Sequence, residues 1–122
     1  MTGRPYAGYV REAVLDRCGV TQMRIGRGPL AQRAPKEVVY AGQGADPYRV
    51  KVMRADSCGG WIASPSDLVR FVTHVDGLSD TPNILKPETI ATMTTPSAIN
   101  PRYAKGWIVN RKRSSDRTVL TA

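Results

Sequence analysis

The stretch SPSDLVRFVTHV, residues 64–75, predicts one helix of this chain more clearly than any other segment. Ser64 is a favourable N-cap residue and Pro65 suits the first helical position, while Asp67 can reach back to the N-terminal N–H groups. The apolar residues that follow recur at helical spacing: Leu68, Phe71, Val72 and Val75. We therefore expect a helix that ends near Val75 and has Phe71 among its most buried side chains.

A second amphipathic helix is predicted over residues 5–17. Thr2 is a candidate cap, Pro5 suits the first turn, and Gly19 suits a left-handed C-terminal position. Its apolar stripe comprises Tyr6, Val10, Ala13 and Val14.

A shorter helix is predicted to open at Lys86-Pro87-Glu88 and to close at Thr94-Thr95-Pro96. Beyond it, residues 103–110 and 118–121 are rich in aromatic and β-branched side chains, which favours a β-hairpin or edge strands. The expected fold class is α+β, in a single unit over 1–122 with a mainly helical and loop region (1–101) and a strand-rich tail (102–122). The length of 122 residues suits about one domain.

Between Val20 and Gly60 the pattern weakens, because glycine and proline interrupt every candidate element. The segments 38–40 and 50–52 are either short strands or apolar anchors of a long loop. Gly59 and Gly60 precede the predicted helix at Ser64, and glycines there allow close approach by a ligand or by another segment of the chain.

The composition argues against a disulfide-rich protein, a CxxC metal site and a membrane-spanning protein. The two cysteines, Cys18 and Cys58, provide neither a disulfide framework nor a CxxC metal site, so two buried free thiols are expected. No apolar run is long enough to cross a bilayer, and the first residues have no signal peptide. Nothing here distinguishes a cytoplasmic from an exported protein.

The net charge of +8 keeps nucleic acid or an acidic partner open as an alternative. Tyr103 and Trp107 lie among the basic residues Arg102, Lys105, Arg111, Lys112, Arg113 and Arg117, which could contact phosphates. Such charges also solubilise hairpin turns, so nucleic-acid binding is the lower-ranked alternative.

Signatures of nucleophilic catalysis and of phosphate binding are absent from the sequence, which has no S-x-x-K, G-x-S-x-G or G-x-x-x-x-G-K motif. The single histidine, His74, has no metal-ligand residue three or four positions away, so a structural or surface role is favoured. No metal or cofactor is expected.

Four segments in order resemble the serine β-lactamase-related hydrolases, the group of class C β-lactamases, D-alanyl-D-alanine carboxypeptidases and esterases. The similar segments cover residues 5–23, 55–71 (ADSCGGWIASPSDLVRF), 84–93 (ILKPETIATM) and 103–107 (YAKGW). The resemblance implies a β-lactamase-like fold and a parent enzyme in which a serine attacks an amide or ester carbonyl, while a lysine and a tyrosine move protons.

The family's S-x-x-K, Y-x-N and K/H-x-G motifs are all missing from this chain. The resemblance therefore implies a non-catalytic fragment with no catalytic residue, whose partners are the remainder of the parent hydrolase or a second copy. By the same resemblance Gly60, Tyr103 and Trp107 are candidate walls of the substrate cleft, and packing in a core is the alternative for each. The small-molecule substrate would bind only to the complete enzyme.

Overall fold

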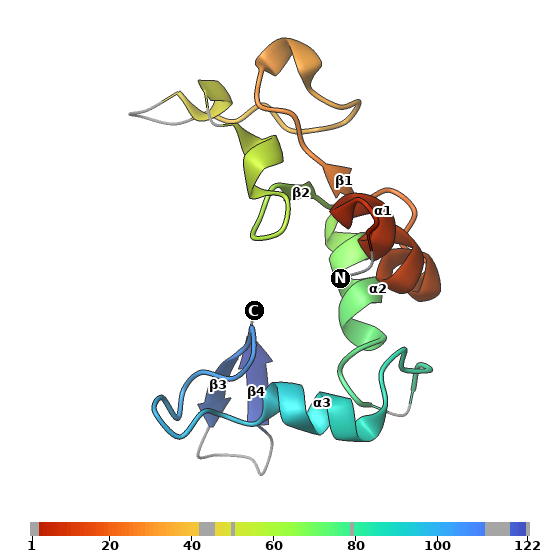
Figure 1. Ribbon diagram of the computed structural model, residues 1–122, viewed down its shortest axis with the longest axis vertical. Coiled ribbons are helices and arrows are strands. Elements are labelled where there is room, and N and C mark those ends of the chain that lie inside the picture. The colour runs from red at the N-terminus through yellow and green to blue at the C-terminus, as the bar shows by residue number, and fades with distance from the viewer. Residues whose placement is uncertain (1–2, 42–45, 50, 79, 112–117, 122) are drawn as a thin grey trace. The chain divides into compact units, whose positions relative to one another are not determined.

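The computed structural model describes residues 3–41, 46–49, 51–78, 80–111 and 118–121, in two compact units, Met1–Val72 and Thr73–Ala122 (Figure 1). The elements are helices and two antiparallel two-stranded sheets, which agrees with the α+β class. Whether residues 1–122 act as a single unit stays a prediction.

The N-terminal helix begins as α1 (Tyr6–Val10), continues through a π-helical turn (Arg11–Leu15) and ends in a 3₁₀ turn (Asp16–Cys18). Gly19 ends it in the left-handed conformation, with φ +65°, as predicted. Pro5 is the N-cap residue and not the first helical residue, and Thr2 lies outside the described residues.

The predicted apolar stripe of this helix is only partly buried. Tyr6 is 38% exposed, whereas Leu15 and Cys18 are buried. In a π-helical turn each N–H bonds five residues back, so positions beyond it no longer keep the α-helical spacing on which the stripe was predicted.

The helix α2 (Pro65–Thr73) confirms the predicted N-terminus. The Asp67 N–H donates to Ser64 Oγ at 3.1 Å, and Asp67 Oδ2 accepts from the Ser64 N–H at 3.3 Å and from its hydroxyl at 2.8 Å. These reciprocal bonds form a capping box, which explains why a carboxylate that is only 3% exposed is tolerated there.

Replacing Ser64 by alanine is expected to lower the free energy of unfolding by about 1 kcal/mol, because the Asp67 N–H loses its acceptor. Urea unfolding measures this change. Ser66→Ala, in the same helical turn but exposed, is the control and should change stability by less than about 0.5 kcal/mol. Equal losses in the two variants would contradict the role of the cap.

Phe71 is the least exposed apolar residue of α2, as expected, but it is not part of the buried core. Phe71 is half-buried, Leu68 is 50% exposed and Val72 is 39% exposed, whereas Val75 is 3% exposed. Helical spacing identifies the apolar face but does not determine what covers it, so the degree of burial of Phe71 does not follow from the pattern.

In the second unit, α3 (Pro87–Thr94) begins and ends where predicted and buries Ile90. The strands β3 (Ile108–Arg111) and β4 (Thr118–Thr121) pair antiparallel from Ile108↔Thr121 to Arg111↔Thr118, which confirms the hairpin. Tyr103 is not part of the strand and forms only an isolated bridge with Ile108. The polar segment 112–117 lies outside the described residues.

The weakly patterned region contains a strand pair that the sequence did not reveal. β1 (Arg24–Ile25) pairs antiparallel with β2 (Trp61–Ile62). Residues 38–40 form no strand and are exposed, and Val52 opens a 3₁₀ turn (Val52–Ala55). Residues 38–40 therefore lie in a loop, but at 50–66% exposure they are not its apolar anchors, and Val50 lies outside the described residues.

The thiols differ from the expectation. Both cysteines are free, but only Cys18 is buried, and Cys58 is exposed. Burial raises the pKa of the Cys18 thiol, against a smaller opposing effect of the Arg17 charge. In the described parts of the chain, no helix has the length and apolar character of a membrane span.

Candidate functional site

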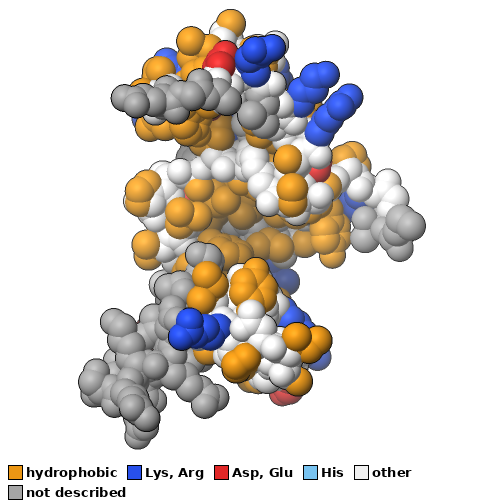
Figure 2. All heavy atoms as spheres, turned by 90° about the vertical axis from the view of Figure 1, so that its left-hand side faces the viewer, with side chains coloured by type: hydrophobic (Ala, Val, Ile, Leu, Met, Phe, Trp, Pro, Cys, Tyr) orange, Lys and Arg blue, Asp and Glu red, His pale blue; other side chains and the backbone are white. Residues whose placement is uncertain are grey.

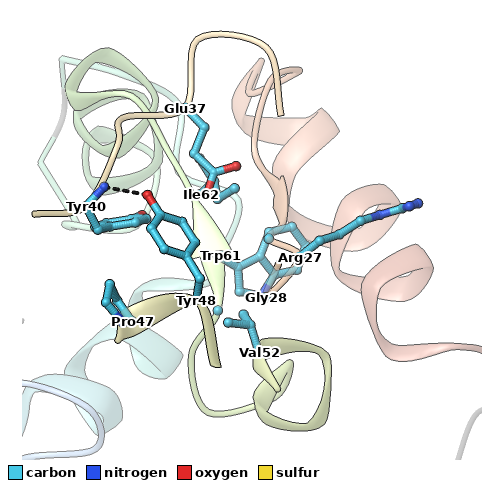
Figure 3. A pocket seen from close by; sticks show the side chains of 11 residues that line it. Arg27, Gly28, Glu37, Tyr40, Pro47, Tyr48, Val52, Trp61 and Ile62 are labelled. Carbon is cyan, nitrogen blue, oxygen red and sulfur yellow. Dashed lines mark hydrogen bonds between the residues drawn. The ribbon is translucent and has the colours of Figure 1, made fainter. Parts of the chain in front are cut away.

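The first unit contains a pocket of about 290 Å³ at the strand β2 (Figure 3). Gly60 and Trp61 line it from the start of that strand, and three further side chains, Glu37, Tyr48 and Val52, line it from the long segment between β1 and β2. The pocket thus joins a residue predicted to border a substrate cleft with residues from the region where the sequence pattern is weakest.

Gly60 is a position that only glycine occupies without strain. Its φ is +77°, and a Cβ atom there would lie 2.6 Å from Val52 Cγ1 and 3.2 Å from the Val52 carbonyl oxygen. The Gly60 carbonyl also accepts a hydrogen bond from the Gly26 N–H at 2.8 Å, which extends the β1–β2 ladder. Of the two alternatives for Gly60, the structure shows close approach by another segment.

Trp61, which lines the pocket, is anchored by two other segments of the first unit. It pairs with Ile25 across the ladder, and the Tyr6 ring meets its indole edge-on, with centroids 6.3 Å apart and an interplanar angle of 66°. Edge-to-face contacts are a favourable arrangement of aromatic rings. The indole therefore contributes both to packing and to the pocket wall.

Two tyrosines form another wall. The Tyr40 N–H donates to the Tyr48 hydroxyl oxygen at 2.7 Å, and the two rings are tilted by 57° with centroids 6.0 Å apart. The Tyr48 N–H donates to Asp46 Oδ1 at 2.9 Å. These bonds hold the Tyr48 ring in place although it belongs to no long helix or strand.

Glu37 is held by a tight turn. Its N–H donates to the Ala34 carbonyl at 3.1 Å, and its Oε2 accepts from the Ala34 N–H at 2.8 Å. Within this turn Lys36 has φ +66°, a left-handed conformation that is unfavourable for residues with a Cβ atom. Glu37 is only 9% exposed. Strained backbone of this kind is often found at ligand-binding positions.

Replacing Lys36 by glycine is expected to raise the free energy of unfolding by up to about 1 kcal/mol, because the relief of left-handed strain, about 1–2 kcal/mol, exceeds the entropy that glycine adds to the unfolded chain, about 0.5–1 kcal/mol. Thermal and urea unfolding measure the change. The matched control is Lys51→Gly, since Lys51 is exposed in the same unit with φ −78° and should lose stability through chain entropy. A loss in both variants would contradict the strain at Lys36.

The other two predicted cleft residues belong to the second unit. Tyr103 is 51% exposed, and Trp107 is half-buried with its carbonyl accepting from the Ala104 N–H at 2.9 Å. Gly60 lines a pocket of the first unit, and the joint role of the three residues in one cleft stays a prediction.

The remaining candidates are the single histidine and the basic residues of the tail. His74 is half-buried, with Nδ1 3.5 Å from Thr73 Oγ1. Within the described residues, no group of three His, Cys, Asp or Glu side chains could hold a metal ion. Lys105 Nζ donates to the Thr92 carbonyl at 2.9 Å, and the basic residues 112–117 lie outside the described part.

Sequence reasoning missed Glu37, Tyr40 and Tyr48. The available signal was local: Pro35 precedes Lys36 in the tight turn, and proline at the second position of a β-turn is a common turn marker. What brings this turn next to Trp61 is the β1–β2 pairing, which no local pattern predicts.

Comparison with known proteins identifies the family. The family model described as Beta-lactamase matches residues 1–120. No curated protein and no solved structure matches the chain significantly. Since the match spans almost the whole sequence, this chain belongs to the beta-lactamase family.

Proposed function

We propose that this chain is a non-catalytic part of a serine hydrolase of the beta-lactamase family, with a β-lactamase-like fold of which it forms mainly the helical region. The parent reaction is cleavage of an amide or ester through an acyl-serine intermediate. One observation carries the proposal: the family match extends over residues 1–120, yet the sequence contains no S-x-x-K, Y-x-N or K/H-x-G motif. A serine nucleophile needs a neighbouring base, and these motifs would supply the pair.

The role of the chain in such an enzyme is to form part of the substrate cleft wall. Gly60 supports this role in the first unit, because its backbone borders a pocket that aromatic side chains also line. Tyr103 and Trp107 are the corresponding candidates in the second unit. The resemblance assigns none of the three a catalytic role, so each would position substrate without reacting with it.

The test is hydrolysis by the purified chain of a chromogenic cephalosporin and of p-nitrophenyl acetate. We expect no turnover above that of the heat-denatured chain. Ser57→Ala is the informative variant, since Ser57 is the serine nearest to Gly60 in the sequence. Turnover that persists through purification and disappears in Ser57→Ala would refute the non-catalytic role.

The partner that we propose is the polypeptide that carries the three missing motifs. Hydrophobic side chains, orange in Figure 2, are exposed on the surface, and exposed apolar patches mark interaction surfaces. The large exposed ones of the first unit include Tyr6, Tyr9, Leu30, Leu68, Val69 and Val72. Sedimentation over a concentration series separates the alternatives: a monomer at all concentrations argues against self-association and leaves the motif-bearing polypeptide as the partner.

A further inference from the structure

We propose that the pocket at Gly60 binds a small organic cation, an amine or a quaternary ammonium group, between the Glu37 carboxylate and the rings of Tyr48 and Trp61. The inference rests on the pocket alone and not on the hydrolase assignment, because it concerns binding without turnover.

The first argument is the charge of Glu37. This side chain is 9% exposed, and its Oε2 is held by the Ala34 N–H, a neutral donor that orients the carboxylate without cancelling its charge. The ion pairs found across the described ranges are Arg4 with Glu12 and Arg70 with Asp67, so none of them neutralises Glu37. Nearly buried charges are usually paired. A cationic ligand would supply the missing partner.

The second argument is the aromatic lining. Figure 3 shows Tyr48 and Trp61 on opposite sides of the pocket, with Glu37 at one end and Val52 at the other. Aromatic ring faces attract cations within about 6 Å of the ring centroid, most strongly for tryptophan. Val52 and Ile62 add aliphatic surface that suits the methyl groups of an alkylammonium ion. An anion would gain nothing from these rings and would be repelled by Glu37.

The third argument is size. Ligand pockets commonly have volumes of about 300–1,000 Å³, and this one, at about 290 Å³, is at the lower limit. It accommodates a ligand of few heavy atoms, such as choline, and excludes a folded partner.

Cationic side chains lie near Glu37, but none forms an ion pair with its carboxylate among the described residues: Arg33 Nη1 donates to the Glu37 backbone carbonyl at 3.0 Å, and Arg24, Lys36 and Arg70 line a second pocket that Glu37 also borders. Arg27 lines the pocket, but Figure 3 shows its guanidinium extending away from Glu37 and Tyr48. The net charge of +8 is distributed along the sequence, and salt at physiological concentration screens exposed charges beyond about 8 Å. Glu37, being nearly buried, is screened much less.

The experiment titrates the chain with choline and with its neutral carbon isostere, 3,3-dimethyl-1-butanol, and follows tryptophan fluorescence in the Trp107→Phe background so that Trp61 is the reporter. We expect saturable binding of choline and at least about tenfold weaker binding of the isostere, since the isostere lacks the positive charge and therefore loses both the Coulomb attraction to Glu37 and the cation–π contribution. Equal binding of both compounds, or binding of neither, would overturn the proposal.

Two variants locate the site. Glu37→Gln keeps an acceptor for the Ala34 N–H but removes the charge, and it should weaken choline binding at least about tenfold. Glu88→Gln, on an exposed position of α3, is the matched control and should bind as the unmodified chain does. If Glu37→Gln does not fold, the comparison of choline with its isostere on the unmodified pocket still tests whether the pocket binds a cation. Choline binding unchanged in folded Glu37→Gln would refute this site.

Discussion

Gly60→Ala is expected to lower the free energy of unfolding by about 2–5 kcal/mol. Two costs add: a left-handed residue with a Cβ atom is disfavoured by about 1–2 kcal/mol, and overpacking costs about 1–3 kcal/mol. The second cost arises because the new methyl group would lie 2.6 Å from Val52 Cγ1 and 3.2 Å from the Val52 backbone oxygen. The Val52 side chain can turn aside, but the backbone oxygen moves only together with the 3₁₀ turn. Urea unfolding followed by tryptophan fluorescence measures the loss.

Gly59→Ala is the matched control, because it makes the same substitution one residue earlier. A Cβ atom at Gly59 meets no other atom within 4 Å, and Gly59 is not among the glycines with positive φ. Its stability should change by less than about 1 kcal/mol. If Gly60→Ala were as stable as Gly59→Ala, the contact with Val52 would be absent in solution.

Leu15→Ala is expected to lower the free energy of unfolding by about 2–5 kcal/mol, the range for truncating a buried leucine. Leu15 is 3% exposed and belongs to the buried set of the first unit together with Cys18 and Val20. A loss of this size approaches the whole stability of a small domain. Differential scanning calorimetry and urea titration both report it.

Leu30→Ala is the control for this substitution, since it removes the same atoms from a side chain that is 50% exposed. It should cost less than about 1 kcal/mol. Comparable losses at Leu15 and Leu30 would show that the N-terminal helix does not bury the face described above.

The parts of the fold that sequence patterns predict are those with local causes. The capping box at Ser64 and Asp67, the stop at Gly19 and the hairpin strands all depend on residues close in the sequence. Phe71 marks the limit of this reasoning. Periodicity gives the apolar direction of a helix, but burial depends on tertiary neighbours that the period does not specify.

The candidate site was predictable only at Gly60. Its two-glycine context before a capped helix indicates a close approach, which the Val52 contact confirms. Glu37 and Tyr48 could not be anticipated, because the pocket depends on pairing between β1 and β2, and two-residue strands leave no alternation to detect. The family's cleft positions Tyr103 and Trp107 remain predictions of the resemblance.

The β1–β2 ladder has a consequence for the order of folding. At the end of the ladder next to the intervening loop, the Gly26 N–H donates to the Gly60 carbonyl, and this bond closes a loop of about 35 residues. The entropy cost of closing a loop grows as the logarithm of its length. Each strand has only two paired residues, so few hydrogen bonds offset this entropy cost. We therefore expect the ladder to form late in folding, after the local helices. Halving the loop would reduce the closure cost by only about 0.6 kcal/mol. The segment between the strands can therefore change greatly in length during evolution while the ladder persists.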